Sequence, residues 1–87
     1  MIITKQLVAE KVSNYLQHKI TLAELVDWAE QAMINESFYQ NDFEVIREVV
    51  SYLGLADVRA FGLQLEDCEN LLRKLGYVIK VEIAQVA

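Results

Sequence analysis

The stretch from Asn41 to Gly54, NDFEVIREVVSYLG, constrains the fold more than any other part of the chain. Read at about 100° per residue, its apolar side chains cover roughly half of the circumference of a helix. These side chains are Phe43, Val45, Ile46, Val49, Val50, Tyr52 and Leu53. A surface helix buries a narrower stripe, so we predict that a helix over about 42–53 contacts two or more neighbours. Asn41 and Glu44 resemble a capping box at its start, and Gly54 suits a left-handed turn at its end.

Length and composition favour one helical domain. The chain has 87 residues, of which 54% are apolar, with no proline and only three glycines. This length predicts a single domain over 1–87, close to the lower limit at which one hydrophobic core can hold a fold. Because proline and glycine are the strongest helix breakers, their scarcity favours long uninterrupted helices.

Apolar residues at three- and four-residue spacing predict three further helices, over about 5–18, 22–34 and 65–75. The second of them has a clear start, because Thr21 and Glu24 have the form of a capping box. Thr4 can cap the first helix in the same way.

Between the last two helices, the spacing of Leu55, Val58 and Phe61 predicts a short additional helical turn. Gly76 follows the last helix and is expected to take the left-handed conformation that ends it.

The period changes from helical to alternating in the segment 77–83, YVIKVEI. One side carries Tyr77, Ile79, Val81 and Ile83. This alternation predicts a β-strand with one solvated face. A strand needs a partner for its backbone groups. Ile2-Ile3 of the same chain could supply it, or the same segment of a second copy could pair antiparallel across a two-fold axis.

The predicted fold class is therefore mainly α: a four-helix bundle-like domain with a short additional helical turn and a carboxyl-terminal β-strand.

Charge and hydropathy exclude several classes of function. Eight basic against thirteen acidic residues give a net charge of −5, and the basic residues are scattered, so we expect no binding to nucleic acid. The longest apolar runs are too short to cross a membrane. The amino end lacks a secretory signal. We therefore expect a soluble cytoplasmic protein.

Residue patterns typical of catalysis are missing. The single histidine, His18, and the single cysteine, Cys68, provide neither a disulfide nor a cysteine–histidine metal site. No glycine-rich phosphate loop, nucleophile elbow or calcium-binding loop occurs in the chain. We expect no enzymatic activity, no metal and no cofactor, and we interpret Cys68, which lies among leucines, as a buried inert thiol.

Surface charge supplies the leading hypothesis. The polar sides of helices 22–34 and 42–53 are rich in carboxylates, and if these helices lie side by side they form one acidic face that would attract a basic protein. The candidate partner-binding residues are Glu24, Asp27, Trp28, Gln31, Tyr39, Glu44 and Glu48. Trp28 has two interpretations, a residue covering the edge of the core or an interaction anchor. An acidic surface that only confers solubility is the alternative.

The runs LAELVDWAEQAM and LGLADVRAFGL, followed by a leucine-rich last helix, resemble small acidic bacterial helical proteins of the colicin-type immunity kind. The resemblance spans about residues 20–75, and the carboxyl-terminal strand departs from it. It implies a bacterial protein that sequesters a basic toxin by charge complementarity.

The sequence thus supports two functional hypotheses. The first is a non-enzymatic protein-binding module that uses an acidic helical face, in the manner of an immunity protein or antitoxin. The second is a structural or regulatory homodimer assembled through Tyr77, Ile79, Val81 and Ile83. Neither names the partner or the pathway.

Overall fold

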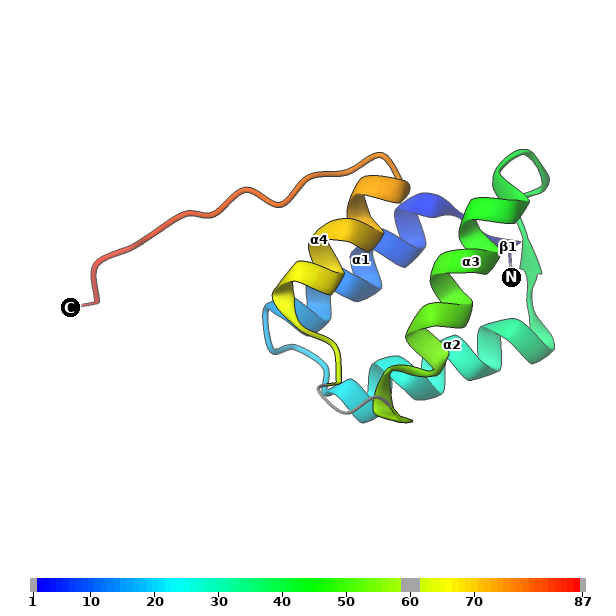
Figure 1. The fold of residues 1–87 in the computed structure, drawn as a ribbon, viewed down its shortest axis with the longest axis horizontal. Coiled ribbons are helices and arrows are strands. Elements are labelled where there is room, and N and C mark those ends of the chain that lie inside the picture. Colours follow the sequence, from blue (N-terminus) through cyan, green and yellow to red (C-terminus); the bar gives the residue numbers. More distant parts are fainter. Residues whose placement is uncertain (1, 59–61, 87) are drawn as a thin grey trace.

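The computed structural model describes residues 2–58 and 62–86, and it is mainly helical as predicted (Figure 1). Its α-helices are α1 (Lys5–Leu16), α2 (Leu22–Asn35), α3 (Phe43–Gly54) and α4 (Leu65–Lys74). The short 3-10 helices η1 (Gln40–Asp42) and η2 (Ala56–Val58) precede and follow α3. In Figure 1, α2 runs across the direction of the other three helices. The closer assignment to a four-helix bundle stays a prediction.

The additional helical turn predicted over Leu55, Val58 and Phe61 is found in part. Ala56–Val58 forms η2, and Ala56 has no exposed surface. Phe61 lies outside the described residues.

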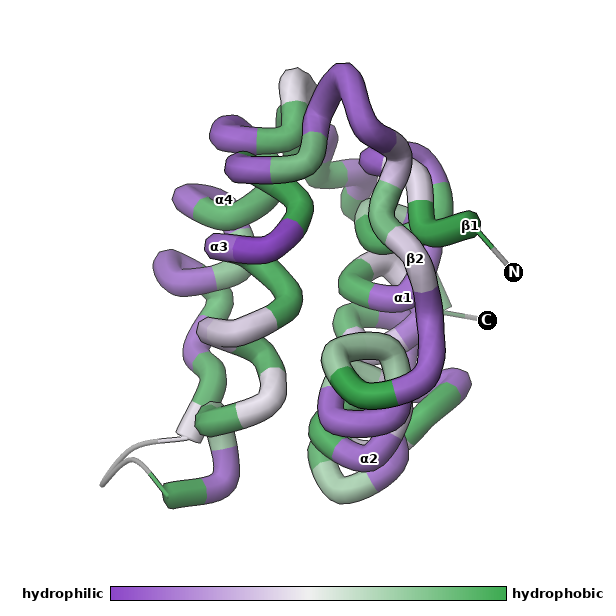
Figure 2. The backbone as a smooth tube through the Cα atoms, turned by 90° about the vertical axis from the view of Figure 1, so that its right-hand side faces the viewer, coloured by the Kyte–Doolittle hydropathy of each residue, from purple (hydrophilic) through white to green (hydrophobic). Residues whose placement is uncertain are grey.

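Helix α3 lies at the centre of the core, and the prediction that it contacts two or more neighbours is confirmed. It packs against α1, α2 and α4. Its inward side chains have no exposed surface: Ile46, Val49, Val50 and Leu53. Figure 2 shows α3 and α4 on one side of the molecule and α1 and α2 on the other. The apolar face of α3 therefore holds these two layers together.

The amino end forms a short parallel sheet. Strand β1 (Ile2–Ile3) pairs with β2 (Ser37–Phe38), with Ile2 beside Ser37 and Ile3 beside Phe38. The Tyr39 N–H donates to the carbonyl of Ile3 at 2.9 Å, and the Ile3 side chain is buried. The sheet thus attaches the start of the chain to the connection between α2 and α3.

Within a single chain, residues 77–83 form no β-strand, so the predicted pairing with Ile2-Ile3 is wrong, while pairing with a second copy stays a prediction. Residues 77–86, here called the carboxyl-terminal arm, run away from the helices without strand pairing (Figure 1). The physical reason is the lack of a ladder partner. Ile2 and Ile3, the candidate partners in the same chain, pair with Ser37 and Phe38 instead.

Side-chain caps start two of the helices as predicted. The hydroxyl of Thr4 accepts from Leu7 N–H at 3.1 Å at the start of α1. At the start of α2, Thr21 and Glu24 form both hydrogen bonds of a capping box.

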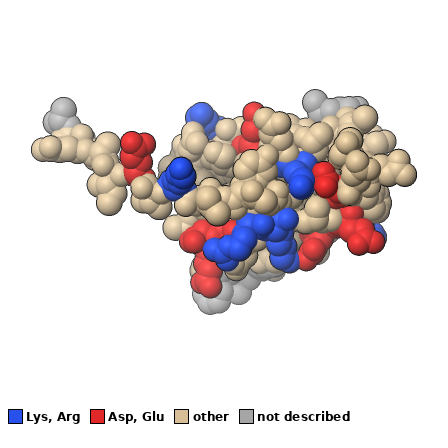
Figure 3. All heavy atoms as spheres, turned by 90° about the horizontal axis from the view of Figure 1, so that it is seen from above, with Lys and Arg blue, Asp and Glu red and all other residues tan. Residues whose placement is uncertain are grey.

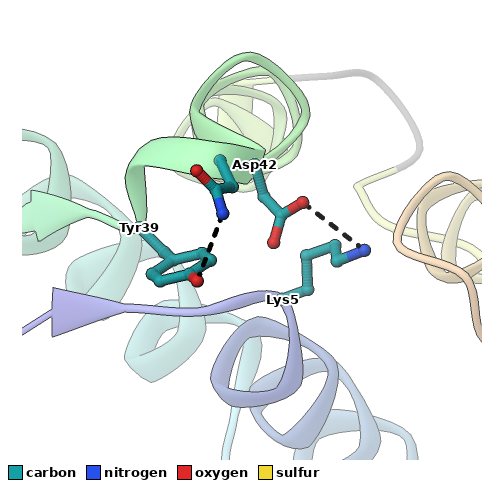
Figure 4. A network of polar contacts seen from close by, with 4 residues as sticks. Lys5, Tyr39 and Asp42 are labelled. Atoms are coloured by element: carbon teal, nitrogen blue, oxygen red, sulfur yellow. Dashed lines mark hydrogen bonds and ion pairs between the residues drawn. The ribbon is translucent and has the colours of Figure 1, made fainter.

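The predicted cap at the start of α3 is wrong. Asn41 lies within η1, which leads directly into α3. The residue before α3 is Asp42, which lacks the extended backbone that a capping residue needs, and its side chain caps no N–H group. Asp42 instead pairs with Lys5 of α1 at 3.6 Å. The Asn41 amide donates to the hydroxyl of Tyr39 at 3.3 Å. Figure 4 shows Tyr39 close to the ion pair of Lys5 and Asp42.

Two helices end in the same left-handed turn. Helix α4 ends with Gly76 at φ 91°, while Tyr77 N–H donates to Leu72 and Gly76 N–H to Arg73. These are the two hydrogen bonds of a Schellman motif. The prediction for Gly76 is confirmed.

Helix α1 ends in this motif too, two residues earlier than predicted. His18 occupies the left-handed position at φ 61°, and Lys19 N–H donates to the carbonyl of Asn14 at 2.8 Å. Gly54, by contrast, is the last residue of α3 and does not have a positive φ, so its predicted left-handed turn is wrong. Leu55 follows it and leads directly into η2.

We predict that His18→Gly raises the free energy of unfolding and that Gly76→Ala lowers it, each by about 0.5 to 1 kcal/mol. The left-handed conformation strains a residue with a Cβ atom and leaves glycine unstrained. Urea denaturation followed by circular dichroism measures both changes. Ala23→Gly on the exposed surface of α2 is the control and should destabilise. A loss of stability in His18→Gly would contradict the prediction.

Candidate functional site

The predicted partner-binding residues of α2 lie on its exposed side and on the side toward α1. Glu24, Asp27 and Gln31 are exposed. Trp28 is half-buried against the core, and the ammonium of Lys11 in α1 lies 5.5 Å from the centre of its ring. This distance suits a cation–π contact. The placement fits the interpretation of Trp28 as a residue that covers the edge of the core.

The predicted residues of α3 are arranged differently. Glu44 and Glu48 are exposed, and Glu48 forms an ion pair and hydrogen bond with Lys74 of α4. The side of α3 toward α2 is marked instead by Ser51, whose hydroxyl lies 3.6 Å from the sulfur of Met33. Glu48 is therefore directed toward α4, and it does not join the carboxylates of α2 in one face.

Tyr39 lies at a third place, beside η1 and the start of α1 (Figure 4). It is exposed, and its hydroxyl accepts a hydrogen bond from Asn41. The neighbouring carboxylate, Asp42, is partly neutralised by Lys5. Figure 3 shows acidic and basic side chains next to each other over the face that it presents. Glu48 and Tyr39 thus lie apart from the predicted residues of α2.

The carboxyl-terminal arm is the most exposed apolar element. Ile79 is half-buried against the core, but Val81, Ile83 and Val86 are 78%, 93% and 91% exposed. Among the described residues, no backbone hydrogen bond joins residues 78–86 to one another or to the helices. The arm therefore presents both apolar side chains and backbone donors and acceptors to a partner.

Where the arm leaves the helices, it borders a groove on α1. Its lining includes Ala9, Ser13 and Leu16 of α1, Tyr77 and Ile79 of the arm, and polar side chains such as Glu10. Two features of these surfaces were missed at the level of sequence: the contact of Lys11 with Trp28 and the exposed Val86. The apolar character of Val86 was the available signal, and the exposure of Val78 agrees with its place on the face expected to be solvated.

The thiol of Cys68 lies in the hydrophobic core. Burial, and secondarily the charge of Asp67, raise the pKa of the Cys68 thiol from 9.0 to about 11. Cys68 has no exposed surface, so its predicted burial is confirmed. Among residues 2–58 and 62–86, no charged side chain is buried and no group of three or more His, Cys, Asp or Glu is placed to hold a metal ion.

Within the described part of the chain, no helix combines the length and the apolar character needed to cross a membrane. Comparisons with protein families, with curated proteins and with solved structures find no match for this chain. The resemblance to colicin-type immunity proteins therefore stays a prediction.

We predict that stability falls as the pH rises from about 9 toward 11, by about 2 to 3 kcal/mol in all. The folded chain keeps the Cys68 proton in this range and the unfolded chain loses it, so ionisation favours unfolding. Urea midpoints measured across this range test the prediction. Cys68→Ala should lose some stability at every pH but lack this decline. An equal decline in both proteins would contradict the assignment to Cys68.

Proposed function

We propose that the protein is a non-enzymatic protein-binding module whose main contact element is the carboxyl-terminal arm. One observation carries the proposal: the arm is extended, and its apolar residues Val81, Ile83 and Val86 are almost fully exposed while the helical core is closed. Exposed apolar residues in a contiguous segment are typical of surfaces that bind other proteins.

The arm suits binding by strand addition. In this mode an extended segment pairs its backbone with a strand of the partner, and alternate side chains enter pockets. Burying one Val or Ile side chain contributes about 1.5 to 3 kcal/mol. The three exposed residues Val81, Ile83 and Val86 can therefore supply a substantial part of a binding free energy, before the cost of association is subtracted.

We predict that Ile83→Asp abolishes capture of the protein's partners, because it places a charge at the most exposed apolar position of the arm. Tagged wild-type and variant chains are incubated with an extract of the native host, and the retained proteins are compared by mass spectrometry. Ile34→Asp is the matched control, since Ile34 is 76% exposed on α2 and outside the arm. Partners retained equally by Ile83→Asp and wild type would contradict the proposal.

A second candidate is the outer surface of α2, as a site for a basic protein. The favouring observation is that Asp27 and Glu30 are exposed and form no ion pair with any described Lys or Arg, whereas Glu48 is paired with Lys74. The chain as a whole carries a net charge of −5, which also attracts a basic partner. A basic toxin of the kind implied by the resemblance is one such partner.

Salt dependence separates the two candidates. If α2 is the binding surface, the double variant Asp27→Lys/Gln31→Lys should slow association with a captured partner by about tenfold at low salt, and raising the salt concentration should weaken wild-type binding. The control Glu69→Lys/Asn70→Lys makes the same changes on exposed residues of α4. Binding that does not change with salt or with the α2 variant would eliminate this candidate and leave the arm.

A further inference from the structure

We infer that the carboxyl-terminal arm binds the arm of a second copy of this chain, antiparallel, about a two-fold axis that passes through Val81. The inference rests on the proposal above that the arm is the contact element. It adds that a second copy of the chain binds there, and in which register the two arms pair. Four observations carry it: the charges of the arm, its apolar pattern, the groove beside it and the pairing of the amino-terminal strand.

The charges of the arm match in this register. Its charged residues are Lys80 and Glu82, one on each side of Val81. When two arms pair antiparallel with Val81 opposite Val81, Lys80 of each copy lies opposite Glu82 of the other. Two cross-strand pairs of opposite charge result, and such pairs stabilise a sheet.

Other registers lack this match. A parallel pairing in register places Lys80 opposite Lys80 and Glu82 opposite Glu82. An antiparallel pairing centred on Lys80 or on Glu82 places that residue opposite itself. Moving the centre to Ile79 or Ile83 leaves both charged residues without a charged partner. The arm's own sequence therefore selects the register centred on Val81.

The same register also places the apolar residues of the two arms opposite one another. Ile79 of each copy lies opposite Ile83 of the other, and Val81 lies opposite Val81. These side chains share one face of the paired arms, because directly opposite residues of an antiparallel pair point to the same side. Pairing thus covers Val81 and Ile83, which are 78% and 93% exposed in the single chain.

The groove on α1 supplies the support that two strands alone would lack. An isolated two-stranded ribbon is marginal in water and needs packing against another element. Ile79 already packs against the core beside the groove formed by Ala9, Ser13 and Leu16. Because Ile83 of the second copy lies opposite Ile79, it comes to this groove, and the two-fold axis repeats the contact on the other copy.

The remaining observation is that the arm has no strand partner in its own chain. Ile2 and Ile3 pair with Ser37 and Phe38. The paired region, residues 77–85, extends over roughly 30 Å, so the helical parts of the two copies lie at opposite ends of the ribbon.

Charge reversal tests the register. Wild type should form a dimer in sedimentation equilibrium. Lys80→Glu and Glu82→Lys should each weaken it by about tenfold or more, since each creates two like-charge contacts. The double variant Lys80→Glu/Glu82→Lys should restore the wild-type dimer, and mixing the two single variants should give a heterodimer. Lys19→Glu, exposed outside the arm, is the control and should change nothing.

Cysteine cross-linking provides an independent measurement. Val81→Cys should form a disulfide-linked dimer on mild oxidation, because the Cα atoms of directly opposite residues lie about 4.5 to 5.5 Å apart, within the range of a disulfide. Val78→Cys should not, because Val78 lies opposite Ala84 in this register. Cys68 is buried and does not compete. Cross-linking at position 78 as efficient as at position 81 would overturn the register.

The outcomes separate this inference from the proposed function. If the chain remains monomeric at the highest concentration reached, the inference that a second copy binds the arm is overturned. If Ile83→Asp nevertheless loses captured partners, the arm still binds, but to another protein. If the chain is monomeric and Ile83→Asp retains all captured partners, both this inference and the proposed function are overturned. A dimer that charge reversal does not weaken overturns the arm pairing.

Discussion

The burial of one face of α3 is the interaction on which the rest of the structure depends. Ile46, Val49, Val50 and Leu53 are fully covered by helices that come from both ends of the chain. An 87-residue chain has little apolar surface to spare, so removing this face would leave two thin layers without a common core. Because α3 supplies the buried face that the other helices share, those helices can leave their outer sides exposed.

Most of the helical structure could be predicted because its signals are local. Thr4 and Thr21 cap their helices through residues three positions away, and Gly76 ends α4 through its own backbone conformation. The failed strand prediction, by contrast, depends on information from elsewhere in the chain. Within a single chain, whether 77–83 forms a strand depends on where Ile2 and Ile3 pair, and they pair with Ser37 and Phe38.

The candidate surfaces were predicted less well for a related reason. Helical periodicity tells which side chains point outward, but it does not tell which neighbour each side of a helix meets. Glu48 and Asp27 both read as solvated carboxylates, yet Glu48 meets Lys74 across the α3–α4 boundary while Asp27 remains exposed. Likewise, nothing near Trp28 in the sequence indicates that Lys11 of another helix lies over its ring.

The Schellman turn at Gly76 separates two parts of the chain that contribute differently to the folded core. Before it, almost every apolar residue of α4 is needed for cohesion; beyond Ile79, the side chains contribute little to the folded core. Substitutions in residues 80–86 should therefore change the surface of the arm at almost no cost to the stability of the folded chain. If the arm is the contact element, as proposed, its contact surface can change in evolution without any change in the helical core.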